Sequence, residues 1–258
     1  MQRDDAPILE FDPSPTAVIE PSEQIAPIDV PDRVVLCFFQ DVIAAVVEEH
    51  EGHVIDHVVS EIGRNPIWEL TYGGRRLGLV HPGVGAPLAA AFLEELIARG
   101  CRAFVACGGA GVLVPDVALG HVIVPTGAVR DEGTSYHYAP AGRVNHPSAR
   151  AVDAIVAALE EHAVPHVQGT TWTTDAIYRE TKEKVARRVE EGCLTVEMEA
   201  AAFFAVAAFR GVTFGQLLYA GDDLSGDAWD PRGWDDHVDG RELLFRIAAE
   251  AVLALEPG

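Results

Sequence analysis

The stretch "LTVEMEAAAFFAVAAF", Leu194–Phe209, combines an apolar helix with two acids at its entrance. From Ala200 onward it consists of Ala, Phe, Val and little else, which indicates a helix buried in a hydrophobic core. Glu197 and Glu199 precede that helix on either side of Met198, with no Lys or Arg between them. Acids at a helix N-terminus complement the helix dipole, and acids at the end of a strand also suit a ligand site. Both explanations are open at this point.

On both sides of this stretch, apolar runs of strand length alternate with longer helical patterns. The expected strands are 33–39, 76–81, 102–107, 121–125 and 214–220. The expected helices are 41–50, 88–100, 145–162, 181–192 and 241–255. We expect the glycines of "GGAG", 108–111, to break the third strand. The alternation predicts one α/β domain with a largely parallel or mixed sheet.

The chain is strongly acidic, with 19 Lys and Arg against 40 Asp and Glu and a formal net charge of −21 over 258 residues. Such a surface repels phosphate backbones, so we expect no nucleic-acid partner. No apolar run approaches the roughly 20 residues of a membrane span, and the N-terminus lacks the basic-then-apolar order of a secretory signal. We therefore expect a cytoplasmic protein without a membrane partner.

Cysteine and histidine spacing gives no metal motif. Each cysteine lies in or beside an apolar segment, which is typical of buried free thiols in a reducing compartment. The cysteines are Cys37, Cys101, Cys107 and Cys193. Three histidines with near-ligand spacing, His50, His53 and His57, span a helix end and the next strand, so we expect no metal site.

Residues 1–31 differ from the rest of the chain, because they carry six prolines, many acids and a single Arg. This composition indicates an extended arm rather than a domain, and we place the folded domain at 32–258. The arm is either disordered or lies along a neighbouring subunit.

Four strand ends lead into glycines, or into acids before a helix, where ligand sites of α/β folds gather. They are "GVGAP" (83–87), "CGGAG" (107–111), "TVEMEA" (195–200) and "YAGDDL" (219–224). Glycine lets a ligand approach the backbone, and a helix N-terminus offers free N–H groups. No Walker motif occurs, and "GGAGVL" is not a full dinucleotide fingerprint.

In their order along the chain, "HPGVGAP", "VACGGAGVL", "VEMEAAAFFAVA" and "YAGDDL" resemble the nucleoside phosphorylase family over about residues 33–255. This family includes purine nucleoside and uridine phosphorylases and methylthioadenosine nucleosidases. The resemblance implies a single domain with a mixed, partly barrel-like sheet flanked by helices. It also implies an enzyme that cleaves the bond between a nucleobase and ribose C1′. We expect a homo-oligomer built on a two-fold dimer, with a trimer of dimers as one possibility.

The resemblance assigns the sugar to the acids of the opening stretch. Glu199 is implied to accept hydrogen bonds from the ribose 2′ and 3′ hydroxyls, as an ionised carboxylate does well. Met198 is implied to pack on the sugar face, and Glu197 is expected beside the site. The alternative for both acids is that they only complement the helix dipole.

The base is assigned to the last motif and to the loop "TTWTTDAIYRETKE", 170–183. In purine-cleaving relatives an Asp at the position of Asp222 donates a proton or hydrogen bond to the base, and Asp223 is the competing candidate. The loop has no Gln of the kind that reads uracil, which favours a purine-type base. Candidate residues for stacking on the base are Ile177, Tyr178 and Trp172, although Trp172 and Tyr178 are equally suited to the core. Residues 227–234 form a possible lid, in which Arg232 is a candidate support for Asp222.

The phosphate-binding residues of the phosphorylases are largely missing. Phe39 and Ile43 stand near the positions of a glycine and an arginine in the first turn. The second arginine and a Ser or Thr are replaced within Ala106–Gly109. In these relatives the third arginine comes from a neighbouring subunit, and Arg64, one residue from the expected position, is the only arginine here that could correspond to it. The backbone could still form a weak anion nest at Gly83, Gly85, Gly108 and Gly109.

The nucleophile is therefore open between phosphate and water. Asp41 lies within one residue of an acid that activates water in the nucleosidases, although a helix N-terminal role suits it equally. Residue chemistry favours hydrolysis, and the frequency of phosphorylases in the family favours phosphorolysis. A nucleoside-binding relative without activity is the third reading. We expect no cofactor, with phosphate as a possible co-substrate.

Overall fold

The computed structural model describes residues 4–233 and 238–256. Its strands are β1 (Arg33–Cys37), β2 (His53–Ser60), β3 (Gly63–Tyr72), β4 (Arg75–Val80), β5 (Ala103–Val112), β6 (Val122–Asp131), β7 (Val144–Asn145), β8 (His166–Thr174), β9 (Cys193–Glu197) and β10 (Thr213–Asp223). Its α-helices are α1 (Pro21–Gln24), α2 (Gln40–Glu49), α3 (Ala86–Arg99), α4 (Ala149–Glu161), α5 (Lys182–Glu190), α6 (Ala200–Arg210) and α7 (Val238–Ala254). Short 3₁₀ turns lie at η1 (Pro7–Leu9), η2 (Thr134–His137) and η3 (Ile177–Arg179).

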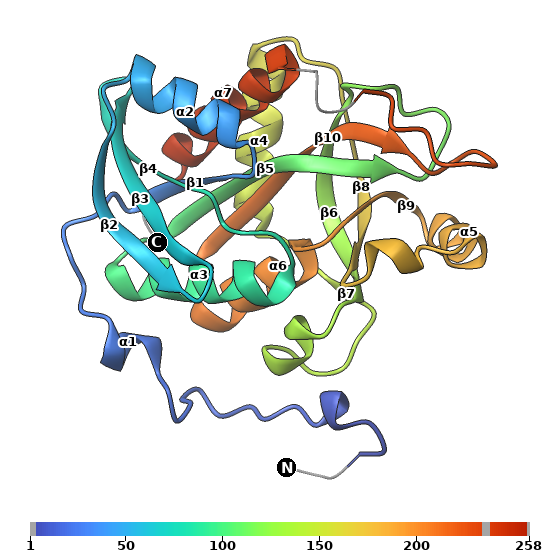
Figure 1. The fold of residues 1–258 in the computed structure, drawn as a ribbon, viewed down its shortest axis with the longest axis horizontal. Coiled ribbons are helices and arrows are strands. Elements are labelled where there is room, and N and C mark those ends of the chain that lie inside the picture. Colours follow the sequence, from blue (N-terminus) through green and yellow to red (C-terminus); the bar gives the residue numbers. More distant parts are fainter. Residues whose placement is uncertain (1–3, 234–237, 257–258) are drawn as a thin grey trace.

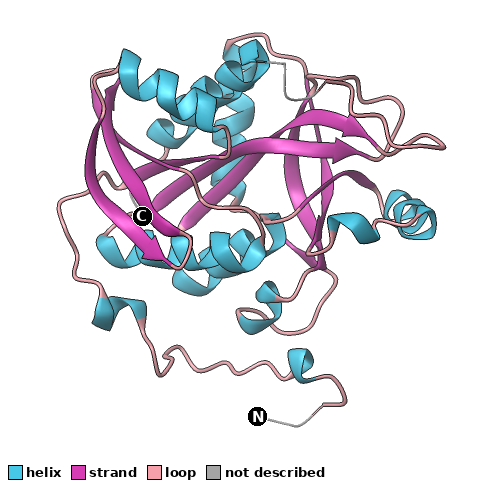
Figure 2. Cartoon of the chain, viewed as in Figure 1, coloured by secondary structure: helices cyan, strands magenta, loops and turns pink. Residues whose placement is uncertain are grey.

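The strands form one mixed sheet that closes partly on itself (Figure 1). The order is β10-β6-β8-β9-β5-β1-β4-β3-β2, and β10 also pairs with β5. This second pairing closes five strands, β5, β6, β8, β9 and β10, into a barrel from which the others extend. Helices flank the sheet on both sides (Figure 2). The predicted single α/β domain with a mixed, partly barrel-like sheet is confirmed.

The alternation of side chains along β1 explains how one sheet supports two helical layers. Val35 and Cys37 belong to the hydrophobic core beneath α2, α4 and α7. Val34 and Leu36 point the other way, into the core that α3 and α6 cover. Because successive strand residues face opposite sides, a run of apolar residues such as "RVVLC" must be buried on both faces.

The expectation that "GGAG" ends a strand is wrong. β5 continues through these glycines to Val112 because β10 runs parallel beside it, pairing Leu218 with Gly108 and Tyr219 with Gly109. A neighbouring strand supplies the ladder hydrogen bonds that keep a glycine run extended. The β2–β3 hairpin and β8 were not among the expected strands and complete the sheet.

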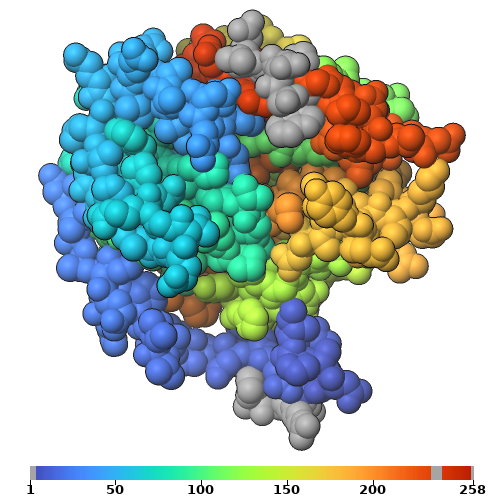
Figure 3. Space-filling view, viewed as in Figure 1, coloured from blue at the N-terminus to red at the C-terminus, as the bar shows by residue number. Residues whose placement is uncertain are grey.

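The N-terminal arm lies along its own chain (Figure 3). Glu20 is buried and pairs with Arg210 of α6 at 2.7 Å. The backbone N–H of Ile28 donates to the carbonyl of Arg99 at 3.1 Å. These contacts join the second half of the arm to the folded domain, and its association with a neighbouring subunit stays a prediction.

The remaining global expectations can be checked against the described residues. All four cysteines are buried and unpaired. Within residues 4–233 and 238–256, no group of His, Cys, Asp and Glu has the geometry of a metal site. No helix in those ranges has the length and apolar character needed to cross a membrane.

Candidate active site

The acid Glu199 lies where two helix N-termini meet. It is the N-cap residue of α6, and its side chain is only 6% exposed. Its Oε1 accepts a hydrogen bond from the backbone N–H of Gly85, the N-cap of α3, at 2.6 Å. Gly85 has a φ of 92°, which favours glycine at this contact. The "GVGAP" and "TVEMEA" motifs are thus brought together, although they are far apart in sequence.

Glu197 is used inside the protein rather than presented to a ligand. Its Oε2 accepts the backbone N–H groups of Glu199 and Ala200, both at 2.7 Å. Its Oε1 accepts the hydroxyl of Thr173 at 2.6 Å. The carboxyl group therefore caps α6, and the expectation that it contributes to sugar binding is corrected in favour of the helix-terminal explanation. Thr173, which the sequence reading missed, also accepts the N–H of Ala201 at 3.0 Å.

Burial makes both acids hold protons more tightly than ordinary glutamates. Burial raises the pKa of Glu197 to about 7. Burial, and then the charge of Glu197, raises the pKa of Glu199 to about 8. A carboxyl group in this state ionises readily only when a ligand offers it hydrogen-bond donors. Met198, between the two acids, is half-buried.

Asp222 lies across β5 from the strand that carries these acids. A Cβ atom built on Gly111 would come within 3.4 Å of Asp222 Oδ1 and within 3.1 Å of Val196 Cγ1. Gly111 pairs with Val196 in the sheet, two residues before Met198. The "CGGAG", "TVEMEA" and "YAGDDL" motifs therefore converge around Gly111, as expected for strand ends that line one site.

The loop after β10 folds back over Asp222. The indole N–H of Trp229 donates to Asp222 Oδ2 at 2.6 Å. Glu180, at the start of α5, lies close enough for the charge of Asp222, after burial, to help raise its pKa to about 7. Trp229 falls within the segment 227–234 considered as a lid, of which residue 234 lies outside the described residues. Glu180 was missed, since a single acid in a polar loop gives no signal.

Arg232 does not support Asp222 as expected. It forms an ion pair with Asp223 and donates to the carbonyl of Val117 at 3.2 Å. Burial alone would raise the pKa of Asp223, but hydrogen bonds from Ser225 and the charge of Arg232 outweigh it and lower that pKa. Asp223 is therefore an ion-paired residue at the end of β10, which leaves Asp222 as the candidate acid.

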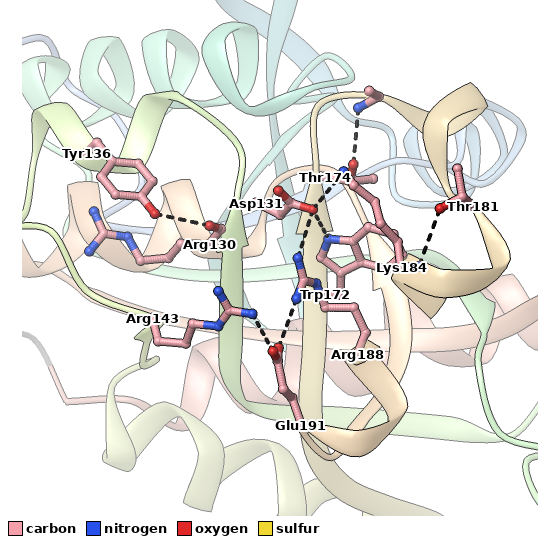
Figure 4. A network of polar contacts seen from close by, with 11 residues as sticks. Arg130, Asp131, Tyr136, Arg143, Trp172, Thr174, Thr181, Lys184, Arg188 and Glu191 are labelled. Carbon is pink, nitrogen blue, oxygen red and sulfur yellow. Dashed lines mark hydrogen bonds and ion pairs between the residues drawn. The ribbon is translucent and has the colours of Figure 1, made fainter. Parts of the chain in front are cut away.

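Trp172 is a core residue, and its assignment to the base is corrected. Its side chain is 0% exposed, and its indole N–H donates to Asp131 Oδ2 at 3.0 Å (Figure 4). The guanidinium of Arg188 lies 5.3 Å from its ring centroid, which fixes the ring further. Ile177 and Tyr178, by contrast, are exposed on η3, and their contact with a base stays a prediction.

The turn after β1 is filled by an aromatic ring. A Cβ atom built on Gly108 would lie 2.8 Å from Cδ2 of Phe38, so the ring covers this glycine directly. His81 packs edge-on against Phe38, with ring centroids 6.1 Å apart. His81 Nδ1 accepts the backbone N–H of Gly83 at 3.1 Å. Burial lowers the pKa of His81, although a hydrogen bond with the Phe38 backbone acts the other way.

The proposed anion nest is therefore incomplete. Of its four backbone N–H groups, that of Gly83 is bound by His81 and that of Gly85 by Glu199. Gly108 is buried under Phe38, while Gly109 is exposed. The expectation of four converging amides is corrected, because the chain's own side chains already use two of them.

Asp41 and Arg64 each have a partner on another element. Asp41, in the first turn of α2, pairs with Arg241 of α7 at 3.3 Å. This contact suits the helix-terminal role, and the assignment of Asp41 as a general base stays a prediction. Arg64 is exposed on β3, where its guanidinium lies 3.3 Å from the ring of His57. Its role in a neighbour's site stays a prediction.

Arg241 itself was missed by sequence reading. It is only 7% exposed, and its guanidinium lies 5.3 Å from the ring centroid of Phe39. It thus places a buried positive charge beside the first turn, where family phosphorylases carry an arginine. No local motif marks it, because it comes from the last helix of the chain.

Comparisons with known proteins agree with this convergence of motifs. The family model described as "Phosphorylase superfamily" matches residues 32–255. A guanosine phosphorylase of Halorubrum lacusprofundi is 34% identical over 193 residues, covering 72% of this chain and 79% of that protein.

Two solved structures show the same fold. The uridine phosphorylase of Vibrio fischeri ES114 has a TM-score of 0.75 at 24% identity, covering 90% of this chain and 95% of that one. The AMP nucleosidase of Bacteroides thetaiotaomicron VPI-5482 has a TM-score of 0.69 at 24% identity, covering 87% and 89%. With a family model matched over nearly the whole domain, the chain belongs to the phosphorylase superfamily, whose members cleave nucleoside glycosidic bonds.

Proposed function

We propose that the protein hydrolyses the N-glycosidic bond of a nucleoside with a purine-type base. In this reaction water adds to C1′ of the sugar, the bond to the base breaks, and the base leaves with a proton. The transition state has oxocarbenium character, so the sugar must be held firmly while the base is protonated.

Glu199 is the residue we assign to the sugar. Gly85 holds its carboxyl group in place through one oxygen, and a carboxylate has about four acceptor positions in all. Two vicinal hydroxyls would satisfy two of the remaining positions and favour the ionised form. The binding of sugar then supplies the donors that offset the burial of the charge.

Asp222 is the residue we assign to the base, as proton or hydrogen-bond donor. Trp229 fixes one of its oxygens, and the neighbouring Glu180 places a second acid beside it. An acid within hydrogen-bond reach of the leaving base can act as its general acid.

The contact between Phe38 and Gly108 carries the choice of water over phosphate. A phosphate dianion needs charge-assisted hydrogen bonds, each contributing roughly 1.5–3 kcal/mol. At the position of the missing donors the protein has a phenyl ring and a histidine whose pKa is lowered by burial. A neutral, apolar wall of this kind disfavours an anion and admits a water molecule.

Phosphorolysis is the second candidate, and Arg241 favours it. Its buried guanidinium lies beside the first turn, and the relative at 34% identity is named a guanosine phosphorylase. In this alternative, Arg241 would exchange Asp41 for phosphate. A homo-oligomer is proposed for either reaction, and in the phosphorolytic alternative Arg64 would serve a neighbour's site.

The test is to incubate the protein with adenosine, inosine, guanosine, uridine and methylthioadenosine, with and without phosphate. We expect free base and free sugar from a purine nucleoside at the same rate in both conditions. Sugar 1-phosphate that forms only with phosphate supports the second candidate. Saturable nucleoside binding without any product would contradict both and identify a non-catalytic relative.

A further inference from the structure

A cleft of about 560 Å³ lies between α5 and the loop that follows β10. In Figure 1 both segments project on the same side of the molecule. Its apolar lining includes Leu113, Val185, Ala186, Val189, Leu224 and Trp229. Sites of roughly 300–1,000 Å³ hold drug-sized ligands, so this volume exceeds what the ring of a nucleobase requires.

The walls of the cleft are mainly apolar, with Lys182 and Asp227 at its edge and Glu180 on the side of Asp222. The side chains of Leu113, Val185 and Trp229 come from three different segments, yet face the same space. Lys182 and Asp227 lie within 3.8 Å of each other across the opening and are both exposed. An apolar interior with a polar edge suits an apolar group whose attachment point is polar.

The cleft adjoins the candidate active site through two shared residues. Trp229 lines the cleft and donates to Asp222. Leu224 lines the cleft as well, and its Cδ1 would lie 2.6 Å from a Cβ on Gly111. The cleft therefore continues from the base side of the site, beyond Asp222, rather than forming an isolated surface feature.

We propose that this cleft binds an apolar substituent on the leaving base, attached to the edge that faces away from the sugar. The proposal rests on the function proposed above, since it extends the base side of the same site. An unsubstituted purine would leave these apolar walls in water, whereas a substituent of one aromatic ring would bury them. Trp229 offers a flat surface for such a ring.

The experiment compares binding of adenine and 6-benzylaminopurine to the full-length protein by calorimetry. These two bases differ only in a benzyl group on the exocyclic nitrogen, on the edge opposite the sugar attachment. We expect the benzyl compound to bind at least about tenfold more tightly, from the apolar area it removes from water. Equal affinities, or the absence of binding by the benzyl compound, would overturn the proposal.

Variants locate the preference. Ala186→Trp fills the cleft from α5, and we expect it to reduce the preference to near unity. Arg187→Trp adds the same side chain one residue later, outside the lining, and should retain the preference. Val189→Phe replaces the first variant if that one fails to fold. If the cleft-filling variant keeps the full preference, the benzyl group binds elsewhere and the proposal is wrong.

Binding is measured on free bases, so the result does not depend on turnover. A benzyl preference in a protein that cleaves no nucleoside would keep this inference and contradict the proposed function. Nucleoside cleavage without a benzyl preference would keep the proposed function and contradict this inference.

Discussion

Two ends of the candidate site differ in how they are built. The sugar end, comprising Glu197, Glu199, Thr173 and Gly85, is a dense set of buried hydrogen bonds. The nucleophile end, comprising Phe38, His81 and Gly108, is packed with rings where relatives of the resembled family bind an anion. At the sugar end, buried polar groups must find hydrogen-bond partners inside the protein. At the nucleophile end, apolar rings occupy the space instead.

This difference indicates that the two ends of the site are under different physical constraints. A buried carboxyl group is tolerated only where donors or a ligand compensate it, so the sugar end is constrained by its own contacts. The nucleophile end has no such constraint, because uncharged residues at the positions of the missing donors leave no unpaired charge there. The contacts at one end of the site can therefore be kept while the residues at the other end change.

The largest expected effect comes from removing the acid of the sugar end. Glu199→Ala removes the group assigned to both sugar hydroxyls, and we expect kcat/KM for the cleaved nucleoside to fall by roughly a thousandfold. Circular dichroism should show an intact fold, since Glu197 still caps α6. Near-normal turnover in this variant would contradict the assignment.

A somewhat smaller effect is expected at the base. Asp222→Asn keeps the shape but cannot donate a proton, so we expect kcat to fall by roughly a hundredfold. If kcat of this variant matches that of the unmodified protein, another group donates the proton.

The comparison can be sharpened at the nucleophile end. Phe38→Ala uncovers Gly108, and we expect phosphate then to stimulate turnover a few-fold where it had no effect before. Phe38→Leu is the matched control, since it keeps an apolar cover and should remain indifferent to phosphate. Indifference of both variants would mean that the ring is not what excludes the anion.

The smallest expected effect is on stability. The pKa values of about 7 and 8 for Glu197 and Glu199 lie above the ordinary value of 4.5. The folded protein thus holds protons that the unfolded chain has released, so the free energy of unfolding should fall as the pH rises from about 5 to 8.

Glu199→Gln removes one of these protonation sites and keeps the shape. We expect it to raise the free energy of unfolding at pH 8 by on the order of 1–2 kcal/mol and to leave it nearly unchanged at pH 5. Thermal unfolding at the two pH values measures the difference. A variant that is less stable at both values would show that the ionised carboxylate itself stabilises the fold.

Apolar periodicity predicted a single α/β domain, the resemblance implied its partly barrel-like sheet, and the strand ends predicted the convergence of motifs. The glycines 108–111 were expected to break a strand that in fact continues through them, and Glu197 was not separated from Glu199. Their different roles depend on Thr173 and on two helix N-termini, which are contacts between distant segments.

The misses share a physical reason. Trp172 was open between core and base because an aromatic residue in a strand suits either. Only the packing of Arg188 and Asp131 places it in the core. Phe38, Arg241 and Glu180 act through spatial neighbours that no local pattern reveals. A side chain that fills or charges a site from another element is visible only in three dimensions.

The most direct test of the central claim is the origin of the new oxygen on C1′. Turnover of a purine nucleoside in oxygen-18 water with saturating phosphate, followed by immediate mass spectrometry of the sugar, gives that origin. The expected result is free sugar that carries one oxygen-18 atom, at a rate that phosphate does not change. Sugar 1-phosphate as the product, with its bridging oxygen derived from phosphate, would contradict the account.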